Sequence, residues 1–146
     1  MKAYYSGHYE SYGLNCQAVC DANLKFIFFG VVGPGKTNDN VAFPRCLFLY
    51  KKVEKLPPGI YFLGDAAYTL TEHFLVPFTG SQRDNVDNDA DNFYLSQLQI
   101  RIEMAFGRLV RKWGILKKNM AFRLAKTSHI LQACVRLHNF LINQQL

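Results

Sequence analysis

The feature that most constrains the fold is a short apolar run, residues 60–63, that ends in Gly64-Asp65. An uninterrupted apolar run of this length, preceded by prolines and a glycine at residues 57–59, predicts a buried β-strand. The strand delivers Asp65 to its carboxyl end, where open α/β sheets gather their functional groups. We therefore expect an α/β fold with an acidic residue at the functional edge of the sheet.

A second acid, Glu103, lies in a basic stretch and is the only acid between residues 101 and 126. Apolar side chains recur there at helical spacing, which predicts a helix with Glu103 just off its buried stripe. The stripe consists of Leu98, Ile102, Phe106, Leu109, Trp113 and Leu116. Carboxylates from a strand end and a helix are hard oxygen ligands suited to Mg²⁺ or Mn²⁺, and two such ions can clamp both oxygens of a phosphodiester displacement. The two acids therefore point to nuclease or strand-transfer chemistry.

Several short motifs follow one another in the order of a known family. They are YYSG at residues 4–7, LNCQAVCD at 14–21, PGKTND at 34–39, LGDAAY at 63–68, EMAFGRL at 103–109 and LHNF at 137–140. In this order they resemble the endonuclease domain of PIF/Harbinger transposases, a branch of the DDE superfamily. The resemblance covers nearly the whole chain and implies an RNase H-like fold, a mixed sheet flanked by helices.

The resemblance also implies the roles of individual acids. Asp65 and Glu103 match the second and third catalytic acids, and Asp39 matches a further acid that binds metal, so the implied cofactor is Mg²⁺ or Mn²⁺. The family's first catalytic Asp lies on a strand upstream of the residues matched by Tyr4 and Tyr5. We therefore expect residues 1–146 to be an N-terminally truncated DDE endonuclease domain that lacks its first, central strand.

The net charge of +6 suggests a polyanionic partner. The basic stretch is stronger evidence, because counterion release from DNA phosphates rewards clustered cations. The alternative is a solvated helix face balanced by the acidic segment 84–91. Gln99 and Val110 depart from the family pattern, which usually has Arg and Lys there. The residues that we expect to bind DNA are Arg101, Arg108, Arg111, Lys112, Lys117 and Lys118.

Partners and location follow mainly from the resemblance. It implies DNA as the partner, in the form of transposon ends or derived sites, together with a nuclear location and a separate Myb-like DNA-binding protein, and it allows a homo-oligomer. No apolar stretch approaches the roughly 18 residues needed to span a bilayer, so we expect no membrane partner. The four cysteines lack the spacing of a zinc site and predict free, buried thiols.

Two other functions are compatible with the sequence. One is a catalytically dead, transposase-derived protein that binds DNA without cutting it. The missing first Asp favours this alternative, so the sequence does not decide whether the chain is an enzyme. The other is a P-loop nucleotide-binding protein, because residues 30–37, GVVGPGKT, satisfy G-x-x-x-x-G-K-[ST]. Pro44 argues against the P-loop, since it would break the helix that such a loop must open into.

The remaining patterns predict local structure. We expect strands at residues 14–19 and 26–29 joined by a turn at 21–23, a flexible connector at 30–35, and a short helix at 38–50 interrupted by Pro44. A short strand at 74–78, a polar loop at 81–92 and a final helix at 127–143 complete the pattern. Asp21 is expected to shape the first turn, and His138 to be a hydrogen-bonded packing residue.

Overall fold

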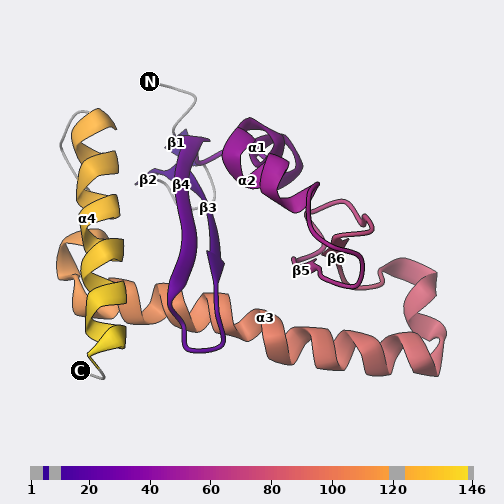
Figure 1. The fold of residues 1–146 in the computed structure, drawn as a ribbon. Helices are drawn as coiled ribbons and strands as arrows, with labels where there is room; N and C mark the ends of the chain where they lie inside the picture. The colour runs from indigo at the N-terminus through magenta and orange to yellow at the C-terminus, as the bar shows by residue number, and fades with distance from the viewer. Residues whose placement is uncertain (1–4, 7–10, 119–123, 145–146) are drawn as a thin grey trace. The chain divides into compact units, whose positions relative to one another are not determined.

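The computed structural model describes residues 5–6, 11–118 and 124–144; Tyr4 and Gly7 of the N-terminal motif lie outside the described residues. Its elements are β1 (Tyr5–Ser6), β2 (Ser11–Tyr12), β3 (Leu14–Cys20), β4 (Phe26–Pro34), α1 (Asp39–Arg45), α2 (Leu47–Val53), β5 (Phe62–Leu63), β6 (Phe74–Leu75), the 3-10 helix η2 (Gly80–Asp84), α3 (Val86–Lys112), the 3-10 helix η3 (Gly114–Lys117) and α4 (Leu124–Asn143) (Figure 1). The chain divides into two compact units. We call Met1–Thr37 with Arg101–Leu146 the hairpin unit, and Asn38–Ile100 the Asp65 unit.

The mixed α/β class is confirmed, since the described residues contain both strands and helices. Among the described residues the strands pair two by two: β1 with β2 and β3 with β4 are antiparallel, and β5 with β6 is parallel. The RNase H-like topology stays a prediction.

Within the described part of the chain, no helix is both long and apolar enough to cross a membrane.

Asp21 shapes the turn between β3 and β4, as predicted. Its Oδ1 accepts hydrogen bonds from the backbone N–H groups of Asn23 and Lys25, both at 2.9 Å. Leu24, in the same turn, has a φ of 67°, in the left-handed region that costs a non-glycine residue roughly 1–2 kcal/mol. Its side chain is only 3% exposed, so burial of an apolar side chain offsets the backbone strain.

The core of the hairpin unit is formed by three segments that are far apart in the sequence. It consists of Leu24 and Phe26 from the hairpin, Ala105 and Leu109 from α3, and Cys134 and Val135 from α4. Figure 1 shows α4 running alongside the hairpin. Because each segment contributes only two buried side chains, the hairpin depends on the helices to bury its apolar face.

Two polar side chains on α4 fix the hairpin to that helix. His138 donates from Nε2 to the carbonyl of Leu24 at 2.8 Å. The Asn139 side chain accepts from the N–H of Phe26 at 2.9 Å and donates to its carbonyl at 2.8 Å. These bonds satisfy backbone groups that would otherwise be costly to bury. The packing role predicted for His138 is confirmed, and the LHNF motif acts as a structural clamp.

The prediction of a flexible connector at residues 30–35 is wrong for all but the last of these residues. β4 continues to Pro34, and Gly30, Val31 and Gly33 pair with residues of β3. The P-loop alternative fails for the same reason, because a phosphate-binding loop needs amide groups that are free to surround phosphate. In this chain the first five residues of the P-loop pattern form part of an antiparallel hairpin.

The prediction of a polar loop at residues 81–92 is also wrong. After η2, helix α3 begins at Val86, with Asp87 and Asp89 in its first turn. Carboxylates are stabilised at a helix N-terminus by the helix dipole, so these acids mark a helix start rather than a loop. Leu98, expected in the buried stripe, is 55% exposed, whereas Ala105 is fully buried.

The short helix expected at residues 38–50 is two helices, α1 and α2, separated at Cys46. Pro44 lies inside α1, near its C-terminal end. α4 begins at Leu124, earlier than expected.

All four cysteines are free, as predicted, but only Cys134 is buried; Cys16, Cys20 and Cys46 are half-buried.

Candidate functional site

Asp65 follows the carboxyl end of β5 after Gly64, as the sequence predicts. The buried strand expected at residues 60–63 is wrong in its length and burial, because β5 has only two half-buried residues and Ile60 and Tyr61 are exposed. The N–H of Gly64 donates to the carbonyl of Leu75 at 2.9 Å, which extends the parallel pairing with β6 up to the acid. Asp65 then begins a turn, in which its Oδ1 accepts from the N–H of Ala67 at 2.9 Å. The side chain is exposed. Because an ionised carboxylate has about four acceptor positions, this bond leaves capacity for another ligand.

Gly64 is required by crowding around the strand end. A Cβ at this position would overlap Cε1 of Phe74 and lie 2.9 Å from both Cζ of Phe74 and Cδ2 of Tyr68. From α3, the Nε2 of Gln99 donates to the Gly64 carbonyl. The backbone beside Asp65 is therefore fixed from two directions. Gln99, which departs from the family pattern, therefore has a positioning role. The sequence did not indicate this role, because Gln99 and Gly64 are 35 residues apart.

The turn after Asp65 packs against α1, the helix that begins with Asp39. Phe43 of α1 makes edge contacts with Tyr68 and Phe74, with ring centroids 5.9 and 5.3 Å apart. The hydroxyl of Thr69 also donates to Oδ1 of Asn40 at 3.1 Å, next to Asp39. The structure thus brings the helix of Asp39 and the turn of Asp65 together within the Asp65 unit. Asp39, in the first turn of α1, also suits the positive end of the helix dipole.

Glu103 belongs to the hairpin unit and projects from α3 as an exposed side chain. Within the same motif, Ala105 and Leu109 are buried in the core and Phe106 packs against it. Gly107, one turn after Glu103, would find no atom within 4 Å of an added Cβ, so there is open space on this face, as expected. The motif therefore combines packing residues with one exposed carboxylate.

The donor chemistry of the three acids suits a hard cation. Asp39, Asp65 and Glu103 offer only carboxylate oxygens, which Mg²⁺ and Mn²⁺ prefer to softer ligands. Asp39 and Asp65 lie in one unit and Glu103 in the other. In the part of the chain that the structure describes, no three His, Cys, Asp or Glu side chains form a group that could hold an ion. The residue types fit a divalent cation, while a complete ligand cluster is absent from these residues.

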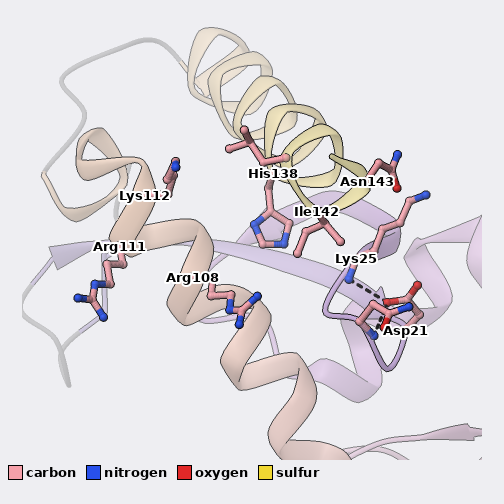
Figure 2. A pocket seen from close by; sticks show the side chains of 10 residues that line it. Asp21, Lys25, Arg108, Arg111, Lys112, His138, Ile142 and Asn143 are labelled. Carbon is pink, nitrogen blue, oxygen red and sulfur yellow. Dashed lines mark hydrogen bonds between the residues drawn. The ribbon is translucent and has the colours of Figure 1, made fainter. Parts of the chain in front are cut away.

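All six residues predicted to bind DNA are exposed. Three of them line a groove with a volume of 1090 Å³ in the hairpin unit (Figure 2). The groove is bordered by α3, by the turn between β3 and β4 and by the C-terminal part of α4, and its charged residues are Asp21, Lys25, Arg108, Arg111 and Lys112. Lys25 was not predicted, because nothing in the sequence indicates that this turn lies beside the basic helix.

Comparisons with known proteins extend these observations. A family model described as DDE superfamily endonuclease matches residues 1–139. "Protein ALP1-like" from Arabidopsis thaliana is 25% identical over 151 residues, a match that covers 93% of this chain and 37% of that protein. The chain therefore spans little more than a third of the length of this curated relative. No solved structure matches the chain.

Proposed function

This chain belongs to the DDE superfamily of endonucleases, and we propose that it forms part of a divalent-metal-dependent domain that cuts and joins DNA phosphodiesters. The proposed branch is the PIF/Harbinger type, with an RNase H-like topology. The observation that carries the proposal is the position of Asp65, an exposed carboxylate directly after a parallel strand whose end is held by Gly64 and Gln99. A fixed backbone beside an exposed acid is what a metal ligand requires.

The proposed ligands are Asp65, Glu103 and Asp39, and the resemblance implies one further Asp upstream of Tyr4. Each acid would offer a carboxylate oxygen to Mg²⁺ or Mn²⁺. A bound divalent cation would supply Lewis acidity to the phosphodiester and to the attacking hydroxyl. The Ala67 N–H restrains the carboxylate of Asp65 through Oδ1, so that its orientation is set before a cation arrives.

Support for DNA as the substrate comes from the exposed cations of the hairpin unit. Six Arg and Lys side chains on α3, on η3 and directly after it can neutralise backbone phosphates without reading sequence: Arg101, Arg108, Arg111, Lys112, Lys117 and Lys118. A nuclear location, a Myb-like partner protein and a homo-oligomer complete the proposal, on the family resemblance alone.

A plasmid-nicking assay in Mg²⁺ tests this function. A chain extended upstream to include the further Asp should convert supercoiled DNA to the nicked form, and Asp65→Asn and Glu103→Gln should each lower the rate at least about a hundredfold, since each removes a charged ligand. Asp91→Asn, a change of another exposed acid, is the matched control and should leave the rate unchanged.

The second candidate function is DNA binding without cleavage, which the basic groove favours on its own. If the same extended chain binds DNA with salt-sensitive affinity but never nicks it in Mg²⁺ or Mn²⁺, this candidate is supported and the nuclease is refuted.

A further inference from the structure

A cavity of different character lies within the Asp65 unit, lined by residues of α1, of α2 and of the segment 68–74. Its volume of 610 Å³ is within the roughly 300–1,000 Å³ of a typical ligand site. Its lining combines aromatic rings with carboxylates, from Phe43, Tyr50, Tyr68, Phe74, Glu54 and Glu72. Among the described residues, no Lys or Arg lines it. In a chain whose net charge is +6, this aromatic cavity thus carries the opposite charge.

The rings of the aromatic cavity are fixed by contacts with one another. Phe43 makes edge contacts with Tyr50 and Phe74, with ring centroids 5.6 and 5.3 Å apart. The ring of Tyr68 packs against Phe74 with centroids 4.9 Å apart. Tyr50 and Tyr68 are only half-buried, so part of each ring is open at the cavity wall. The face of such a ring attracts a cation, and the attraction grows as the cation loses water.

One carboxylate of the aromatic cavity is held by an adjacent ring. Tyr50 lies on α2 and Glu54 is the C-cap of that helix, one turn later, so the two side chains share a face. The hydroxyl of Tyr50 donates to the Glu54 carboxylate, a bond that raises the pKa of the tyrosine. The carboxylate keeps further acceptor positions, because it has about four in all.

The other polar groups of the aromatic cavity are also acceptors. Glu72 and His73 are the central residues of a turn at 71–74, which two backbone hydrogen bonds close at 3.0 and 3.3 Å. The Nδ1 of His73 donates to the carbonyl of Ile60 at 3.1 Å, because a carbonyl can only accept. In the neutral ring, Nε2 is then an acceptor. The cavity therefore suits a ligand that is rich in donors.

A guanidinium group matches this combination of rings and acceptors. It is planar, it stacks on aromatic faces, and its N–H donors bind carboxylates in pairs. The ammonium group of lysine is a compact, strongly hydrated charge that stacks less well. A DNA phosphate would be repelled by the two carboxylates. Asp39 and Asp65 are not among the lining residues, so the cavity is separate from the proposed metal ligands.

We propose that the aromatic cavity binds an arginine side chain presented by a basic segment of another protein. The guanidinium group lies against the rings of Tyr50 and Tyr68 and donates to the carboxylates of Glu54 and Glu72. The rest of the cavity takes the backbone on either side of that arginine. This inference does not rest on the proposed function, because neither DNA nor a metal ion takes part in the binding.

The test is an NMR titration of the isotope-labelled parent chain, without DNA or divalent metal, with an acetylated and amidated pentapeptide that carries one central arginine. Amide shifts should be largest at lining residues such as Tyr68 and His73 and small throughout the hairpin unit. The same peptide with citrulline, an uncharged side chain of nearly the same shape, should bind about tenfold more weakly, because it loses the charge that strengthens both contacts.

Variants of the chain locate the binding energy. Glu54→Gln/Glu72→Gln should weaken binding of the arginine peptide about tenfold. Asp84→Asn/Asp91→Asn removes the same charge from exposed acids of the same unit that do not line the cavity, and as the matched control it should leave the affinity unchanged. Tyr50→Leu should weaken binding about threefold, whereas Tyr50→Phe keeps the ring and should stay within about twofold of the parent.

Each outcome decides for or against the inference. Equal affinity for the arginine and citrulline peptides, or equal affinity of the parent and Glu54→Gln/Glu72→Gln, overturns the site. A lysine peptide or tetramethylammonium that binds as tightly overturns guanidinium as the ligand. If sedimentation shows that the parent self-associates and that Glu54→Gln/Glu72→Gln does not, the occupant is a second copy and the proposed partner is overturned.

The citrulline comparison needs no change in the chain, so it decides the question if a variant fails to fold. The nuclease and this inference also fail separately. Peptide binding without nicking refutes only the nuclease, whereas nicking without peptide binding overturns only the aromatic cavity as a binding site.

Discussion

The two compact units are stabilised by different kinds of interaction. In the hairpin unit a core of aliphatic and aromatic side chains is joined to α4 by side-chain bonds to the backbone that span more than a hundred residues of sequence. The Asp65 unit has strands of only two residues, and edge contacts among Phe43, Tyr68 and Phe74 hold α1 to the turn after Asp65. The core of the hairpin unit thus supports a surface rich in Arg and Lys, whereas in the Asp65 unit close packing around Gly64 fixes the backbone beside Asp65.

The largest effect is expected in the core of the hairpin unit. Leu109 is 1% exposed, so Leu109→Ala should lower the free energy of unfolding by about 3–5 kcal/mol through lost burial and a cavity. Urea unfolding followed by the fluorescence of Trp113, the single tryptophan of the chain, measures this in the hairpin unit. Met104→Ala, on the same helix and 41% exposed, is the control. A loss below about 1 kcal/mol for Leu109→Ala would show that this core is not tightly packed.

The clamp on α4 should have the next largest effect. Asn139→Ala leaves the N–H and the carbonyl of Phe26 without their side-chain partner, which should cost about 2–3 kcal/mol. Asn143→Ala, at the exposed end of the same helix, should change stability by no more than about 0.5 kcal/mol. Equal effects of the two substitutions in the same unfolding assay would show that Asn139 does not stabilise the packing of the hairpin on α4.

The Asp65 unit can be challenged at Gly64. Gly64→Ala puts a methyl group onto the rings of Phe74 and Tyr68, and the strain should cost about 1–3 kcal/mol. Hydrogen exchange at the amides of Phe62 and Gly64, which donate to His73 and Leu75, should become faster. Gly107→Ala is the opposite case: its Cβ meets open space in a helix, so it should stabilise by about 0.5–1 kcal/mol. Unchanged exchange in Gly64→Ala would mean that crowding does not hold the strand end.

The smallest effect separates the thiols of the two units. Burial raises the pKa of Cys16, on β3, from 9.0 to about 11. Folding therefore favours its protonated form, and the stabilisation it adds is present below pH 9 and lost as the pH rises toward 11. At pH 8 its alkylation should be about a hundredfold slower than in the unfolded chain. Burial also raises the pKa of Cys46, but an N–H from Leu49 opposes the shift, so Cys46 should react faster. Mass spectrometry of alkylated peptides checks this order.

Sequence reasoning succeeded where the physical cause is local. The Asp21 turn and the strand that leads to Asp65 follow from turn chemistry and an apolar run within a few residues. Glycines at residues 30–35 suggested a connector, but cross-strand pairing with β3 makes them a strand. The acids at residues 84–91 suggested a loop, although their charge stabilises the start of α3.

Some parts of the site had no local signal. Gln99 reaches Gly64 across 35 residues and Asn139 reaches Phe26 across 113, so neither bond is visible in a window of sequence. The same holds for Lys25, whose place beside α3 depends on how the hairpin packs. Long-range packing, rather than residue type, decides these positions.

The most direct test of the proposed acid set is calorimetric titration of the parent chain with Mn²⁺ in the absence of DNA. We expect saturable binding that is weakened at least tenfold by Asp65→Asn and by Glu103→Gln but unchanged by Asp91→Asn, because only the first two remove proposed ligands. Binding of equal strength in all four proteins, or no binding to the parent, would contradict the assignment of Asp65 and Glu103 as metal ligands.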